Sequence, residues 1–261
     1  MSDFDRNASA RWGQGVARAG RAEIDQGLRT FMLGVYNNMV VGLALTGLVA
    51  LGVNMLAVAG DSSQAVAQMG RIPLTAFGAA IYGSPLRYVL MLAPLAFVLF
   101  FSFRINQMSA SSARALFFAF AAAMGLSLSS ILLIYTGNSV ARAFFITSAA
   151  FGGLSLYGYT TKRDLSAMGA FLVMGLIGLV IASVVNLFVQ SSAFQFGLSI
   201  LSVLIFSGLT AWDTQAIKEM YYESDGYEVA TKKSVNGALM LYLDFINIFQ
   251  SLLYLTGSRN N

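Results

Sequence analysis

The chain contains seven apolar runs, each close to the roughly 20 residues that an α-helix needs to cross a bilayer. Of its 261 residues, 57% are hydrophobic and 11% are charged, whereas about a quarter of the residues of a soluble domain are charged. Backbone polar groups find no water in hydrocarbon, so runs of this length are expected to be helical. The sequence therefore predicts an all-α polytopic membrane protein with spans near 33–58, 86–103, 114–134, 141–160, 167–189, 194–217 and 235–255.

A polar stretch, residues 1–31, precedes the first apolar run. It contains Gly13, Gly15 and Gly20, and glycine disfavours a helix because its backbone loses the most conformational freedom on folding. The glycines are expected to break any helix here. This stretch is therefore predicted to be a flexible cytoplasmic arm whose arginines contact anionic lipid headgroups.

The seven runs are expected to pack as one transmembrane domain over residues 32–257, followed by a short tail over 258–261. The first connection carries a further apolar piece, from Pro73 to Pro85, which is too short to cross a bilayer. We expect an interfacial or re-entrant segment there instead of an eighth membrane-crossing helix.

Basic residues gather on alternate connections. Twelve of the 16 Lys and Arg residues fall in the arm and in the second, fourth and sixth connections, and the other four are Arg71, Arg87, Arg142 and Arg259. Because cytoplasmic loops are enriched in Lys and Arg, the N-terminus is predicted to lie in the cytoplasm and the C-terminus outside. The net charge of +4 thus reflects orientation in the bilayer, and no nucleic-acid partner is expected.

Several function classes are excluded by residues that the chain lacks. It has no cysteine, which excludes disulfides, iron–sulfur clusters and thiol catalysis, and no histidine, which excludes a Ser–His protease. A retinal pump needs a lysine within its last helix, whereas the four lysines here lie in connections: Lys162, Lys218, Lys232 and Lys233. No cofactor is expected, and any pH sensing must use carboxylates.

Two acidic residues fall inside the last two apolar runs, Asp213 and Asp244. An ionised carboxylate in hydrocarbon is costly, so an acid retained there indicates a functional site. At helical spacing, Asp213 shares a face with Thr210 and Ser202, and Asp244 shares one with Asn247 and Ser251. Such polar faces are expected inside the bundle or along a water-filled path, which makes Thr210, Asn247, Ser202 and Ser251 candidate pathway-lining residues.

If the two helices are neighbours, the aspartates can form a pH-sensitive latch. Two adjacent carboxyl groups cannot both ionise cheaply, so they are expected to titrate as a coupled pair. Deprotonation would loosen the helices and leave oxygen ligands for transient calcium binding. The alternative is that each aspartate bonds to a neighbouring polar group and only supports packing.

The two aspartates differ in depth. At 1.5 Å per residue, Asp213 lies roughly 7 Å from Lys218 and Asp244 roughly 16 Å from Lys233. The pair therefore meets only if the last helix tilts or extends into the cytoplasm.

Two further interpretations concern Arg104 and catalysis. Arg104 ends the second run on the cytoplasmic side and is either a positive-inside anchor or a salt-bridge partner of Asp213.

Intramembrane aspartyl proteases also place one aspartate on each of two consecutive helices, but they use a Gly-x-Gly-Asp stretch and a later Pro-Ala-Leu. Here Asp244 follows Leu241-Tyr-Leu, and the last proline is Pro94, so no enzyme is predicted.

Six segments, in this order and spacing, resemble the bacterial form of the Bax inhibitor family, also called transmembrane Bax inhibitor motif proteins. They are Leu92-Ala-Pro-Leu95, Phe101-Ser-Phe-Arg-Ile-Asn106, Gly125-Leu-Ser-Leu-Ser-Ser130, Leu156-Tyr-Gly-Tyr-Thr-Thr-Lys-Arg-Asp-Leu-Ser166, Trp212-Asp-Thr-Gln215 and Leu241-Tyr-Leu-Asp-Phe-Ile-Asn247. The resemblance covers residues from about 30 to 257.

The resemblance implies six helices wrapped around a central seventh and activity as a pH-sensitive calcium leak in the plasma (inner) membrane. It also implies that Asp213 and Asp244 form the latch and that Arg104 engages Asp213. An acid and an arginine that some members carry on the outer side are replaced here by residues such as Ala93 and Tyr254. Family members also act as regulators that bind other membrane proteins, including membrane proteases and cell-death machinery, so a stress or cell-death regulator without conduction is the alternative.

Overall fold

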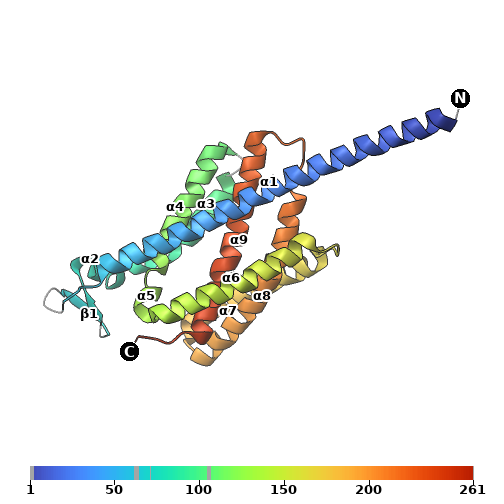
Figure 1. Ribbon diagram of the computed structural model, residues 1–261. Coiled ribbons are helices and arrows are strands. Elements are labelled where there is room, and N and C mark those ends of the chain that lie inside the picture. The colour runs from blue at the N-terminus through green and yellow to red at the C-terminus, as the bar shows by residue number, and fades with distance from the viewer. Residues whose placement is uncertain (1–2, 62–64, 71, 105–106, 261) are drawn as a thin grey trace.

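The computed structural model describes residues 3–61, 65–70, 72–104 and 107–260, which form a bundle of helices with one small hairpin (Figure 1). Its helices are α1 (Asp3–Ala57), α2 (Ala76–Tyr82), α3 (Leu86–Arg104), α4 (Ala110–Leu128), α5 (Ile131–Ile134), α6 (Gly137–Thr160), α7 (Ser166–Val189), α8 (Ser192–Glu219) and α9 (Tyr227–Thr256). The antiparallel strands are β1 (Ala67–Met69) and β2 (Ile72–Leu74). Arg71, Ile105 and Asn106 lie outside the described residues.

Six stretches are long and apolar enough to cross a membrane: Gln26–Ala57, Ala110–Ile134, Gly137–Thr160, Ser166–Val189, Ser192–Glu219 and Tyr227–Thr256. A seventh is obtained if α2 and the first part of α3, which meet at an angle of 65°, count as one broken span. The prediction of an all-α polytopic membrane protein is therefore confirmed, with six to seven candidate spans.

The apolar piece from Pro73 to Pro85 contains the end of β2 and the seven residues of α2. Thr75 caps α2 by accepting a hydrogen bond from the backbone N–H of Gly78, and its hydroxyl donates to the carbonyl of Leu56 at 2.7 Å. Gly78 packs directly against the backbone of Ala57. Thus α2 is fixed to the end of α1 and is too short to cross a membrane alone.

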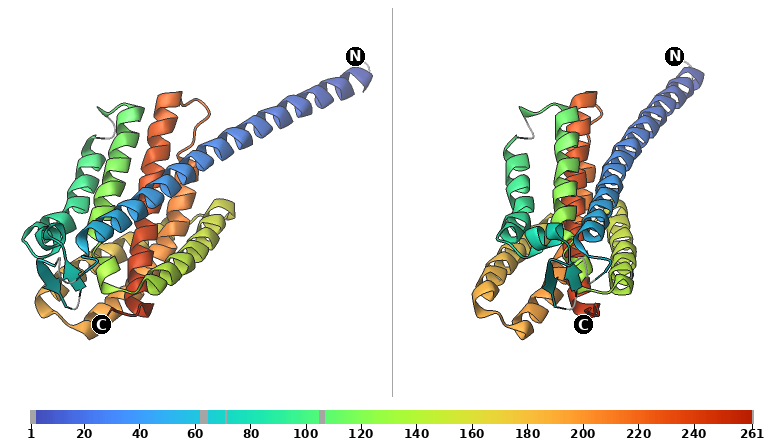
Figure 2. Two further views of the ribbon diagram at one scale, coloured as in Figure 1. Left: turned by 60° about the vertical axis from the view of Figure 1, so that its left-hand side comes forward. Right: turned by 90° about the vertical axis from the view of Figure 1, so that its left-hand side faces the viewer.

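The arm differs from the expectation drawn from its glycines. The backbone is one continuous helix from Asp3 to Ala57, and its N-terminal part projects from the bundle (Figures 1 and 2). The expectation that Gly13, Gly15 and Gly20 break the helix was wrong. A glycine in a helix costs only about 1 kcal/mol relative to alanine, and good helix formers such as alanine and arginine surround these three. The helix over these residues also continues without a break into the first membrane-crossing stretch, Gln26–Ala57.

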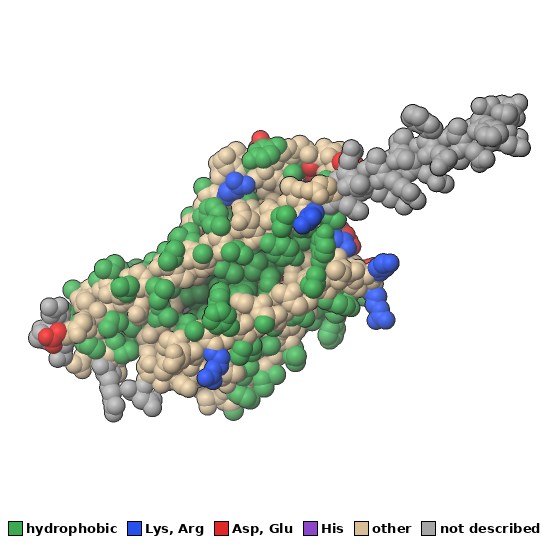
Figure 3. Space-filling model, in the orientation of Figure 1, with side chains coloured by type: hydrophobic (Ala, Val, Ile, Leu, Met, Phe, Trp, Pro, Cys, Tyr) green, Lys and Arg blue, Asp and Glu red, His purple; other side chains and the backbone are tan. Residues whose placement is uncertain are grey.

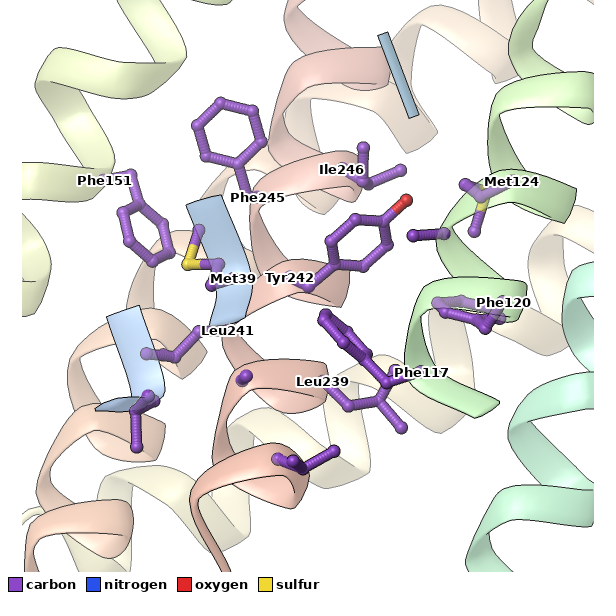
Figure 4. Close-up of a cluster of buried hydrophobic side chains, with 14 of the residues drawn as sticks. Met39, Phe117, Phe120, Met124, Phe151, Leu239, Leu241, Tyr242, Phe245 and Ile246 are labelled. Carbon is purple, nitrogen blue, oxygen red and sulfur yellow. The ribbon is translucent and has the colours of Figure 1, made fainter. Parts of the chain in front are cut away.

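Helix α9 packs against α1, α4, α6 and α8. Tyr242 projects from α9 between Phe117 and Phe120 of α4, with ring centroids 5.8 and 5.5 Å away (Figure 4). Its hydroxyl group lies 2.7 Å from that of Thr46 on α1. On the α6 side, the rings of Phe245 and Phe151 meet at 5.7 Å. Aromatic packing and one polar contact therefore hold α9 to three neighbouring helices.

The other helices form a lipid-facing surface. Helix α3 packs on α4, and α7 packs on α8. Large apolar side chains on this surface stay exposed, including Phe145 and Phe188, as expected where hydrocarbon is the solvent. Figure 3 shows apolar side chains over the middle of one face and most of the visible Lys and Arg side chains near the end from which α1 projects.

Glycines set the closest helix contacts. A Cβ atom added at Gly125 of α4 would lie 2.5 Å from the carbonyl oxygen of Thr46 on α1, whereas one added at Gly152 of α6 would meet nothing within 4 Å. Helices can therefore approach each other closely at Gly125 because no side chain intervenes.

We expect Gly125→Ala to lower the stability of the purified protein by about 1–3 kcal/mol, because the methyl group would push α1 away from α4. The matched change Gly152→Ala should be neutral or slightly stabilising, since alanine is the better helix former. Thermal unfolding in detergent measures both. Equal melting temperatures for the two variants would contradict this account of the α1–α4 contact.

Candidate functional site

The site lies where α8 and α9 run antiparallel, and two contacts define their register. Gly237 of α9 packs against the side chain of Ile217 near the end of α8. Further along, the hydroxyl of Ser251 donates to that of Ser202 at 2.8 Å. The absence of a side chain at Gly237 lets the helices approach there, and this register brings Thr210 of α8 level with Asp244 of α9.

Asp213 and Asp244 meet in this interface. Only 8% of Asp213 and 3% of Asp244 is exposed. The two carboxyl groups are hydrogen-bonded to each other, and the hydroxyl of Thr210 also lies within hydrogen-bonding reach of Asp244. A hydrogen bond between two carboxyl groups requires a proton on one of them. The two aspartates are therefore placed where they can share one proton.

The surroundings of this pair hold little else that is charged. The Oδ2 atom of Asp244 is buried without a hydrogen-bond partner. Within the described ranges, no salt bridge to Asp213 or Asp244 is present, and no group of three or more acidic residues is placed to hold a metal ion. The site can thus supply carboxylate oxygens and a hydroxyl to a cation, but it is not a closed cage.

The difference in depth between the two aspartates is resolved by the length of α9. Helix α9 begins at Tyr227, about 25 Å before Asp244, whereas α8 continues only about 9 Å beyond Asp213. Helix α9 therefore extends past the end of α8 on the side from which α1 projects (Figures 1 and 2). This is the extension that the sequence required for the pair to meet.

Three of the four pathway-lining candidates share one groove. Ser202, Asn247 and Ser251 line a space of about 530 Å³ among α7, α8 and α9, and no charged side chain lines it. Its other polar lining residues include Gln195, Ser199 and Gln250. Thr210 is not part of this lining; it is fully buried beside Asp244, one turn beyond Phe206 at the end of the groove. This groove, which we call the α7–α9 groove, approaches the aspartates from the C-terminal half of α9.

On the other side of the pair the helices are sealed. Ile217, Val235 and Leu241 have no exposed surface, and Gly237 lies against Ile217. The aspartates thus have a groove on one side and packed apolar side chains on the other.

Arg104 does not reach the pair. Its side chain is exposed at the end of α3 and donates a hydrogen bond to the Oε1 atom of Gln107 at 3.2 Å. Helix α3 packs on α4, away from α8. The expected contact between Arg104 and Asp213 is therefore not formed in this conformation, and an exposed anchor at the membrane edge describes the observed geometry.

Sequence reasoning missed a set of polar side chains next to the pair. Gln215 accepts a hydrogen bond from the backbone N–H of Leu165 and donates one to the carbonyl of Arg163, each at 2.8 Å, which fixes the α6–α7 loop to α8. Ser155 of α6 lies 3.0 Å from the hydroxyl of Thr214. The sequence shows that these polar residues lie in apolar helices, but only the fold shows which groups they hydrogen-bond.

Comparison with known proteins matches nearly the whole chain to one family. The family model described as "Inhibitor of apoptosis-promoting Bax1" matches residues 28–261. The chain is 44% identical over 238 residues to the uncharacterized protein RP147 of Rickettsia prowazekii, covering 91% of this chain and 93% of that protein. It is 44% identical to an uncharacterized protein of Caulobacter vibrioides over 99% of each chain, and 41% identical to the inner membrane protein YbhL of Escherichia coli K12, over 89% of this chain and 93% of YbhL.

We expect infrared spectra of the membrane-embedded protein to contain a protonated carboxyl band from the shared proton, lost as the pH is raised. Asp213→Asn and Asp244→Asn should each remove or shift this band, because each breaks the carboxyl–carboxyl hydrogen bond. Asp164→Asn, at an exposed loop position, and Arg104→Gln should leave the band unchanged. A band unaffected by both of the first two changes would mean that the aspartates do not share a proton.

Proposed function

This chain belongs to the Bax inhibitor family, and we propose that it is a pH-sensitive calcium leak channel gated by Asp213 and Asp244. The observation that carries the proposal is the burial of two hydrogen-bonded carboxyl groups between the last two helices of a membrane protein. Acids kept at such depth mark ion or proton pathways more often than packing contacts. The family is not an enzyme family, and no catalytic role is proposed.

Gating follows from the charge on the pair. With one shared proton, the carboxyl groups attract each other and hold α8 against α9. When that proton is lost, two negative charges about 4 Å apart repel by about 4 kcal/mol at an effective dielectric constant of 20. The repulsion favours separation of the helices and breaks the seal around Ile217. The leak should therefore rise as the pH rises through the range in which the pair loses its last proton.

The α7–α9 groove supports a route for the cation. Its lining is uncharged and mostly apolar, but it includes Ser199, Ser202, Asn247 and Ser251, whose hydroxyl and amide oxygens can meet a hydrated cation before it reaches the carboxylates. Calcium prefers six to eight oxygen ligands, and the two carboxylates with Thr210, Asn247 and water provide a transient set. Calcium is thus the transported ion and not a resident cofactor.

The family and the charge distribution support a location and an orientation. The relative YbhL is named an inner membrane protein, and most Lys and Arg residues here fall on one set of connections. We place this chain in the plasma (inner) membrane, with the N-terminus in the cytoplasm, the C-terminus outside and the other six spans arranged around α9. In this orientation the α7–α9 groove opens outward, and the apolar seal faces the cytoplasm.

The competing function is that of a regulator that binds other membrane proteins without conduction. The projecting N-terminal part of α1 favours this alternative, because it offers a helix that the bundle does not cover (Figure 1). The matching family description also refers to inhibition of another protein. The loop over 218–234 is a second candidate surface.

The leak is tested in proteoliposomes loaded with a calcium indicator, across roughly pH 6 to 8. For a gate that releases one proton, wild-type influx should rise by at most about tenfold per pH unit. Asp213→Asn and Asp244→Asn should flatten this dependence, because an amide cannot ionise. Asp164→Asn controls for the loss of an aspartate outside the membrane. No influx at any pH from correctly inserted wild-type protein would reject the channel.

Deletion of residues 1–25 tests the regulator, because these residues precede the first membrane-crossing stretch. If both functions exist, the deletion should abolish co-purification of membrane partners while calcium influx stays at the wild-type level. Loss of influx together with partner binding would show that the arm also supports the channel. Unchanged co-purification would eliminate the arm as the partner surface.

A further inference from the structure

Three hydroxyl groups from three helices form a chain beside the aspartates, buried at Ser155 and Thr214 and partly buried at Tyr36. The Tyr36 hydroxyl on α1 lies 2.7 Å from that of Ser155 on α6, which lies 3.0 Å from that of Thr214 on α8. Thr214 in turn donates to the backbone carbonyl of Thr210 at 2.7 Å. Since the Thr214 proton is used there, Ser155 must donate to Thr214 and Tyr36 to Ser155. We call these three residues the hydroxyl chain.

The hydroxyl chain ends at the level of the pair. Thr214 follows Asp213 directly in α8, and Thr210 is within hydrogen-bonding reach of Asp244. Gly158 of α6 packs against the backbone of Ala211 in the same region, so α6 and α8 are closest where the chain links them. Any movement of α8 away from α6 must break the bond between Ser155 and Thr214.

We propose that Tyr36, Ser155 and Thr214 are positioning residues of the gate. They hold α8 against α1 and α6, which keeps Asp213 opposite Asp244 and favours the closed conformation. The inference rests on the proposed gating by this pair. It adds to the gate Tyr36 and Ser155, which neither the family motifs nor the polar stripes include, and it gives a role to Thr214 of the motif Trp212-Asp-Thr-Gln215. If the hydroxyl chain is lost, less repulsion between Asp213 and Asp244 should be needed to separate α8 from α9. The gate should therefore open at lower pH.

The groups that face this region are few. Tyr36 lines a groove between α1 and α6 together with Arg29 of α1 and Tyr159 of α6. On α8, the Nζ atom of Lys218 donates to the carbonyl of Tyr159 of α6 at 2.9 Å. Gln215 fixes the α6–α7 loop, as described above, and on α9 the facing group is Asp244. Arg29 and Lys218 stay unchanged in every variant below, so their effect on the pair is constant.

Buried serine and threonine hydroxyls in membrane helices often bond only to their own helix, and such a residue provides the control. Thr147 of α6 is fully buried and donates to the carbonyl of Ala143 four residues earlier at 2.8 Å. Thr147→Val therefore removes a buried hydroxyl whose hydrogen bond lies within α6, and it keeps the size of the side chain. Ser155→Ala removes both links of the chain, and Tyr36→Phe removes only the outer one.

Calcium influx against pH in proteoliposomes tests the proposal. We expect Ser155→Ala to move the midpoint of opening to lower pH, Tyr36→Phe to move it less in the same direction, and Thr147→Val to leave it at the wild-type value. A merely structural role would lower the amount of folded protein without moving the midpoint. Coinciding midpoints for Ser155→Ala and Thr147→Val, or a shift to higher pH, would overturn the proposal.

A distance measurement keeps the proposal testable without conduction. The chain has no cysteine, so cysteines introduced at exposed positions Tyr157 of α6 and Leu204 of α8 can be spin-labelled selectively. The distance between the labels should increase as the pH rises, and in the Ser155→Ala background it should increase at lower pH. If these distance changes are observed although neither the wild type nor the variants conduct calcium, the proposed channel is rejected. The positioning role of the hydroxyl chain is then retained. A distance independent of pH in both backgrounds rejects the hydroxyl chain.

Discussion

The cost of an ionised carboxylate inside a bilayer is the constraint on which the rest of this structure depends. Among the described residues, no cationic side chain is paired with Asp213 or Asp244, and the two acids are buried against each other instead. This arrangement requires α8 and α9 to lie face to face with the correct register. Gly237 allows the close approach at one end, and the bond between Ser202 and Ser251 maintains the register at the other. The loop between the helices lets α9 start well before the level at which α8 ends.

The two sides of the pair differ in a way that suits a gate. The uncharged α7–α9 groove, which carries several hydroxyl and amide side chains, lies on one side of the aspartates, and side chains without exposed surface, such as Ile217 and Val235, close the other side. In the proposed channel, most of the rearrangement that completes a path would fall on the apolar side. A small change in one interface could thus control permeation, because packed interfaces switch between discrete arrangements more readily than they deform.

Much of this fold could be predicted from hydropathy, because a bilayer imposes both the length and the composition of a span. The expected spans and the observed helices overlap throughout, and Asp213 and Asp244 stood out because acids are rare in such runs. The prediction that glycines break the helix in the arm was wrong, because a single glycine destabilises a helix by less than the rest of a continuous helix stabilises it. The observed partner of Arg104, Gln107, could not be foreseen, since an exposed side chain chooses among local acceptors. The hydroxyl chain was missed because sequence does not distinguish a hydroxyl that bonds its own helix from one that bonds a neighbour.

Which helix moves when the pair ionises can be argued from how each is held. Helix α9 is fixed on several sides, by the rings that surround Tyr242 and by the contact of Phe245 with Phe151. Moving it would open a cavity in the aromatic core, at a cost of several kcal/mol. Helix α8 is held toward α6 by a glycine contact at Gly158 and by two hydrogen bonds, one from Ser155 to Thr214 and one from Lys218 to the carbonyl of Tyr159. Because a hydrogen bond contributes only about 1 kcal/mol, repulsion within the pair should displace α8 and leave α9 in place.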